Sequence, residues 1–364
     1  MIKDRDQKAK ALRFSVANRW FPQLELEVSA SGAVGRSVAS VTDLDVFACV
    51  PDQFTGFRSV VFDCKTKAKE SPINRALWLL GVLERMGSGQ GFCILKKSSI
   101  DLDHRLMAAG RGIVLLSEDE FDLYVSATTG VNAPLGSNIE QLASWDEFGE
   151  IPKRFPKLEE AVLFTRHQYW MIKEAAEACR KTLAVVRSIH GELDPSQPSH
   201  VALFLDLCAL FARGLAVVVC HVFKAYLHPA SQADLSEALL VMLYGGREAY
   251  QYRNDLYKLV KARNGEAAVP DLSLPEWERF LRLTRQLLDA PLAVQHTPLI
   301  LREVAFGFQN GDKSLAFARK LGSENPQAAR FALLIPGYLV RAANLPSEFE
   351  RIADNALISL QPVR

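Results

Sequence analysis

The first 125 residues combine short apolar runs of period two with amphipathic stretches of helical period. Apolar residues recur at helical spacing over 6–19, whereas Leu24, Leu26 and Val28 alternate with charged residues as in a strand. The pattern predicts a helix, three strands, a helix, a strand, a helix, a strand and a helix, at about 6–19, 24–29, 38–50, 57–65, 72–87, 91–95, 101–109, 112–116 and from 118 onward. Because an antiparallel meander precedes β-α-β crossovers, this order predicts a mixed sheet with helices on its faces.

Strand patterns nearly vanish after residue 157, and long helical patterns follow at 157–190, 198–227, 231–263 and 275–290, with shorter ones to about 357. Residues 127–157 have neither period and contain several glycines and prolines, which is typical of a linker. The sequence therefore predicts an α/β domain over 1–126, a linker over 127–157 and an all-α domain over 158–364.

Composition narrows the class of protein. The chain has 364 residues, of which 49% are hydrophobic and 23% charged, and its net charge is +1, as in an ordinary globular protein. Residues 1–150 carry 17 basic and 20 acidic side chains, and the remainder carries 26 and 22. No global field therefore attracts nucleic acid, so that any nucleic-acid surface must be a local patch.

Neither a membrane nor an oxidising compartment is indicated. The six cysteines lack metal-site spacing and most lie in apolar runs, which predicts buried free thiols in a reducing cytosol. The chain opens on charged and polar residues rather than a secretory signal, so we expect a cytoplasmic location. The apolar run 201–227 contains Asp206, Arg213 and Lys224, and we therefore expect a buried core helix and no membrane partner.

Two predicted strands carry the chemistry. Asp43 and Asp45 are two residues apart in the first, and Asp63 and Lys65 are two residues apart in the second, so each pair shares a strand face. If the strands pair, the carboxylates and the lysine gather in one cluster. Burying such charges without a partner is costly, since breaking a buried ion pair costs about 3–5 kcal/mol. A divalent cation would compensate the charges, because carboxylates are the ligands that Mg²⁺ prefers.

This arrangement resembles the PD-(D/E)xK nuclease superfamily, which has the restriction-endonuclease-like fold. Asp45 matches the aspartate that the family places at the end of its second strand. Asp63 and Lys65 match the Asp/Glu-x-Lys of its third strand, with Cys64 as the variable residue between them. The order of the flanking elements also agrees, and the resemblance covers about residues 6–125.

The resemblance implies a metal-dependent nuclease that hydrolyses phosphodiester bonds, with Asp45, Asp63 and Lys65 as its catalytic residues. The carboxylates of Asp45 and Asp63 and the carbonyl of Cys64 would hold Mg²⁺ or Mn²⁺, and Lys65 would position the attacking water. Among nucleic-acid substrates the family favours DNA over RNA, and such enzymes often serve prokaryotic defence or restriction.

Some positions depart from the family pattern. Asp63 replaces the more usual glutamate, and the first helix offers only Asp4 and Asp6 where many members carry a glutamate. Glu25 or Glu27 could supply the missing carboxylate, and Asp43, which shares a strand face with Asp45, is a further possible accessory residue. Basic residues that could line a phosphate backbone follow the second strand, at Lys67, Lys69 and Arg75. An ordinary solvated basic loop explains these three equally well.

Two alternatives remain open. The nuclease-like domain can be inactive and serve as a nucleic-acid or protein-binding module in a larger complex. Activity can also lie in the all-α domain, where Arg213 and His221 are eight residues apart on one helix, although a satisfied core pair is the simpler interpretation. Otherwise the all-α domain would serve sensing, docking of a protein partner or homo-oligomerisation.

Overall fold

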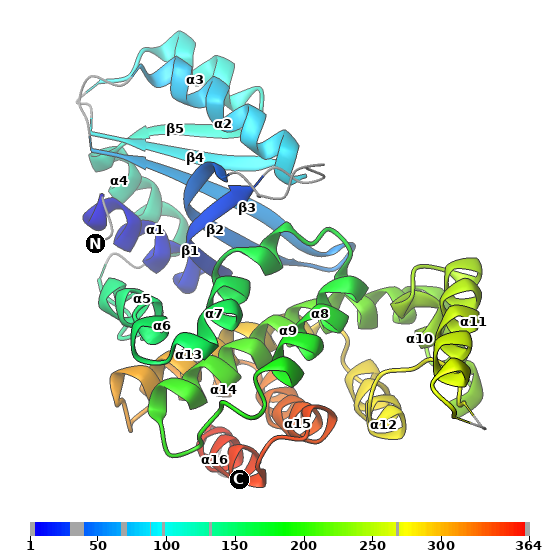
Figure 1. Ribbon diagram of the computed structural model, residues 1–364. Coiled ribbons are helices and arrows are strands. Elements are labelled where there is room, and N and C mark those ends of the chain that lie inside the picture. The colour runs from blue at the N-terminus through cyan, green and yellow to red at the C-terminus, as the bar shows by residue number, and fades with distance from the viewer. Residues whose placement is uncertain are drawn as a thin grey trace. The chain divides into compact units, whose positions relative to one another are not determined.

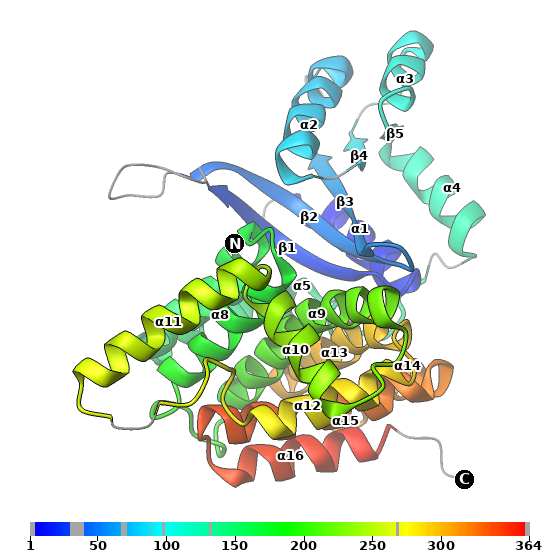
Figure 2. The ribbon, with the colours of Figure 1, turned by 90° about the vertical axis from the view of Figure 1, so that its right-hand side faces the viewer.

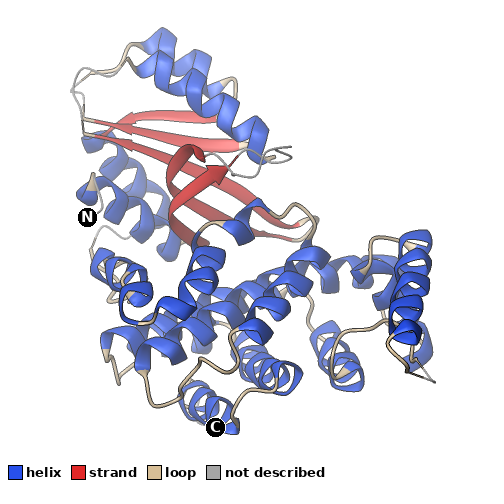
Figure 3. Ribbon diagram, in the orientation of Figure 1, coloured by secondary structure: helices blue, strands red, loops and turns tan. Residues whose placement is uncertain are grey.

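A computed structural model of the chain describes residues 4–29, 40–66, 71–87, 89–96, 99–130, 133–266 and 269–360. Its strands form one five-stranded sheet, and in the described ranges they all lie before residue 118 (Figure 3). They are β1 Phe21–Ser29, β2 Ser40–Asp52, β3 Gly56–Lys65, β4 Gln90–Leu95 and β5 Ile113–Ser117. The expected mixed sheet followed by a mostly helical remainder is confirmed.

The strands lie in the order β1-β2-β3-β4-β5. The first three are antiparallel, whereas β3, β4 and β5 are parallel. The parallel strands are joined by α2 Pro72–Met86 and α3 Leu102–Ala109, which lie along one face of the sheet. The opposite face is covered by α1 Arg5–Ala17 and α4 Glu118–Thr129 (Figure 1).

Helix starts and ends follow from local chemistry. Ser117 begins α4 with a capping box, because its hydroxyl accepts from the amide of Glu120 at 3.2 Å and the Glu120 carboxylate accepts from its amide at 2.7 Å. The predicted start of α2 is correct, with Pro72 in its first turn, although the Ser71 side chain makes no capping hydrogen bond. Gly87 ends α2 in the left-handed region at φ 63°.

An aromatic core lies between the sheet and the α1/α4 layer. Phe62 of β3 and Phe92 of β4 stack with ring centroids 5.0 Å apart. Phe14 of α1 meets both rings edge-on, and Phe121 of α4 completes the group. This packing fixes α1 against β3, which matters for the cluster described below.

Residues 127–157, expected to be a linker, contain α5 Leu142–Gly149 and α6 Ile151–Arg154. Trp145 and Phe148 of α5 are fully buried, and the preceding segment is held by Glu303, as described in the Discussion. The glycines and prolines of this stretch separate short packed helices.

The chain forms two compact units, and their bounds differ from those of the expected domains. Unit 1 comprises 1–171 and 302–320, and unit 2 comprises 172–301 and 321–364. The boundary therefore crosses α13 and α14. A sequence pattern reports periodicity within each helix, and it does not tell which unit that helix joins.

The described helical elements after α6 include three short 3₁₀ turns. They are η1 Pro156–Leu158, α7 Glu159–Arg166, η2 Gln168–Met171, α8 Ala175–Ser188, α9 Pro198–Tyr226, α10 Gln232–Leu243, α11 Arg247–Arg263, α12 Trp277–Leu288, η3 Ala293–His296, α13 Thr297–Asn310, α14 Ala316–Glu324, α15 Pro326–Ala343 and α16 Ser347–Ile358. The helix expected over 157–190 is broken into four of these pieces. The helix expected over 231–263 is broken at Gly245 and Gly246, both at positive φ.

In unit 2, α9 is packed by α8, α12, α15 and η3, and α15 and α16 run side by side (Figure 2). Gly214 lets α8 approach α9 closely, because a Cβ there would meet the Cys179 sulfur at 2.8 Å. By length and composition α9 could cross a membrane, but most of it is buried in the protein. This agrees with the expected core helix.

Candidate functional site

The two aspartates lie where β2 and β3 stop pairing. The last registered pair is Val46 with Phe62, so Asp45 and Asp63 come one residue beyond it, next to each other on adjacent strands. At this point the amide of Cys64 donates to the Asp45 carboxylate at 2.7 Å. A side chain thus satisfies a backbone donor beyond the end of the ladder.

Lys65 joins the two aspartates. Its Nζ lies 3.2 Å from Asp45 Oδ2 and 3.3 Å from Asp63 Oδ1. The side chains of Asp45 and Asp63 are 5% and 1% exposed, whereas that of Lys65 is 25% exposed. The structure therefore brings together the three residues that the sequence singled out, with the carboxylates buried and the lysine reaching solvent.

Arg75, in the first turn of α2, contacts Asp63 rather than solvent. Its Nε lies 2.8 Å from Asp63 Oδ2, and its Nη2 contacts Asp63 Oδ1. The guanidinium also lies over the ring of Trp78, 4.1 Å from its centroid. The solvated-loop interpretation is thus wrong for Arg75, which in this structure holds a buried carboxylate. Lys67 and Lys69 lie outside the described residues.

Lys8 of α1 is a further member of the cluster that the sequence analysis did not identify. Its side chain is 3% exposed, and its Nζ lies 2.8 Å from Asp45 Oδ1 and contacts the carboxylate of Glu25. Lys8 precedes buried Leu12 by four residues and Val16 by eight, so a lysine on the apolar face of the helix was the available signal. Asp4 and Asp6 do not join: Asp4 accepts hydrogen bonds from Thr66, and Asp6 is exposed.

Of the three accessory carboxylates, only one contacts the described residues of the cluster. Glu25 joins the cluster through Lys8, and the β1–β2 register places it opposite Asp45, between the pairs Leu24–Val46 and Leu26–Leu44. Glu27 and Asp43 pair with each other further along these strands and are exposed. We use the name ion-pair cluster for Lys8, Glu25, Asp45, Asp63, Lys65 and Arg75.

Electrostatics keep the lysines of the ion-pair cluster charged. Burial alone would lower the pKa of Lys8, but the carboxylates of Asp45 and Glu25 outweigh it and hold that pKa above its ordinary value. Burial likewise opposes the charge of Lys65, and Asp45 and Asp63 raise its pKa despite the nearby Arg75. Burial also raises the pKa of the Cys64 thiol, and the two aspartates add to the effect. Cys64 is therefore a neutral thiol, as expected for a buried free cysteine, and all six cysteines are buried and free.

The carboxylate oxygens of the ion-pair cluster are the type of ligand that a hard cation prefers, but in this structure they already accept hydrogen bonds or ion pairs. Both oxygens of Asp45 and both of Asp63 accept from Lys8, Lys65, Arg75 or the Cys64 amide. No group of three His, Cys, Asp or Glu in the described ranges is placed to hold a metal ion.

Gln7 supplies a further oxygen beside the ion-pair cluster. Its Nε2 donates to the Lys65 carbonyl at 3.3 Å, and its Oε1 is fully buried with no hydrogen-bond partner among the described residues. Carboxylate and amide oxygens are ligands of Mg²⁺ and Mn²⁺. By the chemistry of their oxygens the residues therefore fit such an ion, provided that it displaces Lys8 from Asp45 and shares an Asp63 oxygen with Arg75.

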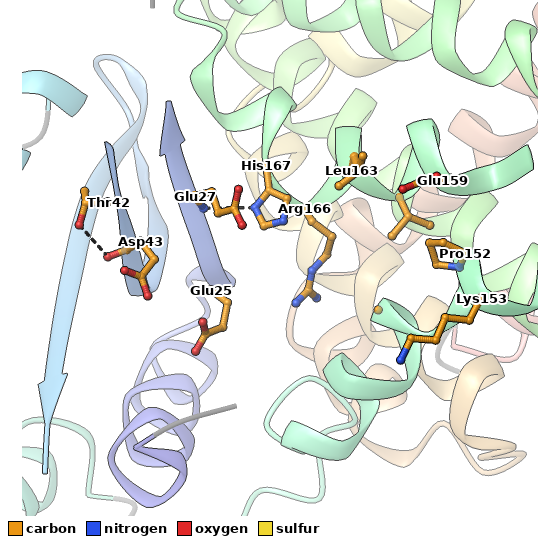
Figure 4. Close-up of a pocket in the computed structure, with 12 residues that line it drawn as sticks. Glu25, Glu27, Thr42, Asp43, Pro152, Lys153, Glu159, Leu163, Arg166 and His167 are labelled. Carbon is orange, nitrogen blue, oxygen red and sulfur yellow. Dashed lines mark hydrogen bonds between the residues drawn. The ribbon is translucent and has the colours of Figure 1, made fainter. Parts of the chain in front are cut away.

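A cavity of about 680 Å³ opens beside the ion-pair cluster within unit 1 (Figure 4). Glu25, Glu27 and Asp43 line it from the strands, and Arg166, His167 and Lys153 line it from the helices. The amide of Glu27 donates to His167 Nδ1 at 3.1 Å. Glu25 therefore belongs to the ion-pair cluster and also lines the cavity.

The second candidate site, in unit 2, is not a buried pair. Arg213 is half-buried and His221 is exposed, both on α9, so the expected core pair is wrong for His221. In unit 1, by contrast, the charged groups converge from α1, β1, β2, β3 and α2.

Comparisons with protein-family models, with curated proteins and with the solved structures find no match to this chain.

Proposed function

We propose that unit 1 contains a restriction-endonuclease-like domain of the PD-(D/E)xK type, and that it is a metal-dependent nuclease hydrolysing phosphodiester bonds. The observation that carries this proposal is the contact of Lys65 Nζ with both Asp45 and Asp63 at 3.2 and 3.3 Å. Ordinary solvated strand charges would not converge in this way, since burying two carboxylates side by side needs a compensating use. The element order around them supports the same proposal.

In this proposal the chain's own residues have distinct roles. Asp45, Asp63 and the Cys64 carbonyl would hold Mg²⁺ or Mn²⁺, with Gln7 Oε1 as a further oxygen donor close by. When bound, such an ion neutralises phosphate charge and lowers the pKa of a bound water. Lys65, the most exposed of the three motif residues, would orient the attacking water. DNA is the favoured substrate by analogy with the superfamily, and a role in prokaryotic defence or restriction belongs to the same analogy.

Cleavage assays test this proposal. The full chain is incubated with plasmid, single-stranded DNA and RNA in Mg²⁺ or Mn²⁺, beside Lys65→Ala and Asp63→Ala variants. Lys65→Ala is the more informative variant because it leaves the Asp45–Lys8 and Asp63–Arg75 pairs in place. Lys10→Ala is the matched control, since Lys10 pairs with Glu118 and Asp122 away from the site. We expect metal-dependent cleavage that both site variants lose and the control keeps. Cleavage that survives in both site variants would contradict the proposal.

One observation favours a second candidate, an inactive nuclease-like module that binds nucleic acid or protein. Lys8, Lys65 and Arg75 balance Glu25, Asp45 and Asp63 in number, so the ion-pair cluster is neutral without a metal ion. Such a module would bind without a divalent cation. Fluorescence anisotropy of labelled DNA in EDTA tests it: binding without cleavage in any metal supports the module, and loss of binding in EDTA opposes it.

A further inference from the structure

Lys8 contacts the Asp45 oxygen that Lys65 and the Cys64 amide do not contact. Cys64 N and Lys65 Nζ both contact Asp45 Oδ2, whereas Asp45 Oδ1 is 2.8 Å from Lys8 Nζ. An ammonium and a divalent cation repel strongly at such distances, because unit charges 4 Å apart interact by about 4 kcal/mol at an effective dielectric constant of 20. Lys8 and a metal ion cannot therefore share this oxygen.

Glu25 gives Lys8 a second partner. Glu25 has a left-handed backbone, with φ of 52° inside a strand, which non-glycine residues rarely adopt. From this position its carboxylate contacts Lys8, and its side chain is 29% exposed whereas that of Asp45 is 5% exposed. If Lys8 leaves Asp45, its ammonium group therefore still has the carboxylate of Glu25 as an anionic partner.

A second observation is the unsatisfied side-chain oxygen of Gln7, whose amide group lies at the Lys65 backbone. Gln7 is adjacent to Lys8 on α1, and its amide lies against the Lys65 carbonyl, with Oε1 buried and without a partner in the described part of the chain. An unsatisfied buried acceptor costs about 1–3 kcal/mol. A cation bound at the ion-pair cluster would be available to this acceptor.

We propose that Lys8 is a built-in competitor of the divalent cation: it occupies Asp45 in the metal-free protein and moves to Glu25 alone when the metal ion binds. This inference rests on the proposed metal-dependent function and concerns the regulation of that site. Its consequence is that the free protein binds metal weakly. A bound phosphodiester, which adds negative charge, then favours the exchange of Lys8 for the metal ion.

Metal binding without nucleic acid tests the inference. Mn²⁺ is titrated into the full chain by calorimetry and by electron paramagnetic resonance, for wild type, Lys8→Met and Lys8→Gln. We expect the dissociation constant to fall at least tenfold in both variants. Lys10→Met, the matched loss of a lysine on the same helix, is expected to stay within twofold of wild type. Adding Asp45→Asn to Lys8→Met is expected to abolish the gain, which locates the new affinity at Asp45.

Folding of the variants gives a second readout. Removing Lys8 takes a cation from Glu25 and from Asp45 Oδ1, while Lys65 and the Cys64 amide still contact Asp45 Oδ2. We therefore expect a lower melting temperature without metal and recovery when Mn²⁺ or Mg²⁺ is added. Equal Mn²⁺ affinity in wild type and Lys8→Met would overturn the inference. So would variants that melt low with and without Mn²⁺, because the ion would then not replace Lys8.

Failure of this inference is distinguishable from failure of the proposed function. If wild type cleaves DNA with Mg²⁺ and Lys8→Met binds Mn²⁺ no more tightly, only the competition is wrong. If Lys8→Met gains affinity while wild type cleaves none of the substrates, the competition stands and the nuclease proposal fails.

Discussion

Arg75 and Asp63 form a two-point contact that ties the start of α2 to the end of β3. Both guanidinium contacts fall on a side chain that is 1% exposed, and among the described residues Lys65 is the cation that would remain beside it if Arg75 were removed. Fork-to-fork contacts of this kind are geometrically specific. The stability of this end of the central strand β3 therefore depends on a residue that the sequence offered as a phosphate contact or as part of a solvated basic loop.

Arg75→Gln is expected to destabilise unit 1 by about 3 kcal/mol, since removing one partner of a buried ion pair costs about 3–5 kcal/mol and Lys65 compensates in part. Urea unfolding followed by tryptophan fluorescence measures the loss, because Trp20, Trp78, Trp145 and Trp170 all belong to unit 1. The matched control is Arg58→Gln, whose ion pair with Asp52 is exposed on the arginine side and is worth at most about 1 kcal/mol. Equal losses in the two variants would argue against a structural role for Arg75.

Alanine substitutions at Gly112 and Gly130 distinguish the cost of backbone strain from the cost of steric overlap. Both have positive φ, at 77° and 68°, but a Cβ on Gly112 would lie 2.3 Å from the carbonyl oxygen of Gly89, whereas one on Gly130 meets open space. We expect Gly130→Ala to cost about 1 kcal/mol for the left-handed backbone. Gly112→Ala is expected to cost about 2 kcal/mol more, because overlap in a packed region typically costs 1–3 kcal/mol. The same fluorescence-detected unfolding measures both, and a difference below about 0.5 kcal/mol would contradict the predicted overlap.

The order of elements in the sheet could be predicted from sequence because each element carries its own local pattern. Period-two alternation marks β1, and Ser117 with Glu120 marks the start of α4. The sequence predicted that Asp45 and Asp63 lie close together only on the condition that their two strands pair, and β2 and β3 do pair.

The rest of the ion-pair cluster could not be predicted, because it depends on where helices pack. Lys8 reaches Asp45 because α1 packs against the sheet, in part through Phe14. The local pattern places Lys8 on the apolar face of its helix, but it does not identify Asp45 as the partner. Arg75 lies twelve residues after Asp63, beyond a segment whose course the sequence does not define. Likewise, residues 127–157 show no helical or strand periodicity in the sequence, and part of this segment is held by a residue far along the chain.

That residue is Glu303, which is fully buried on α13 and holds the segment before α5. Its carboxylate accepts from the Ser137 hydroxyl at 2.6 Å and from the amides of Asn138 and Ile139 at 2.7 and 3.2 Å. Glu303→Ala is expected to destabilise unit 1 by at least about 3 kcal/mol, because these three donors and the side-chain amide of Asn138 lose a charged acceptor. Hydrogen bonds to charged groups are worth about 1.5–3 kcal/mol each. Denaturant unfolding measures it, with Glu348→Ala on the exposed side of α16 as control. A loss no larger than that of the control would mean that the segment is held in another way.

His167 makes the stability of unit 1 depend on pH. Burial lowers its pKa below the ordinary value of 6.5, with Arg166 adding to this effect and Glu27 opposing it. The unfolded chain therefore binds a proton here more readily than the folded chain, so the contribution of His167 to stability falls as pH drops through about 6.5. Protonation would also remove the Nδ1 acceptor that the Glu27 amide uses.

His167→Asn isolates this effect, since the asparagine oxygen can accept from the same amide but does not titrate. We expect wild type to lose stability relative to His167→Asn as pH falls from about 7.5 to 5.5, measured by urea unfolding at each pH. In Glu27→Gln the opposing carboxylate is gone, so the decline should be steeper than in wild type. A difference between wild type and His167→Asn that stays constant across this range, or that grows in favour of wild type, would show that burial does not disfavour the imidazolium at this position.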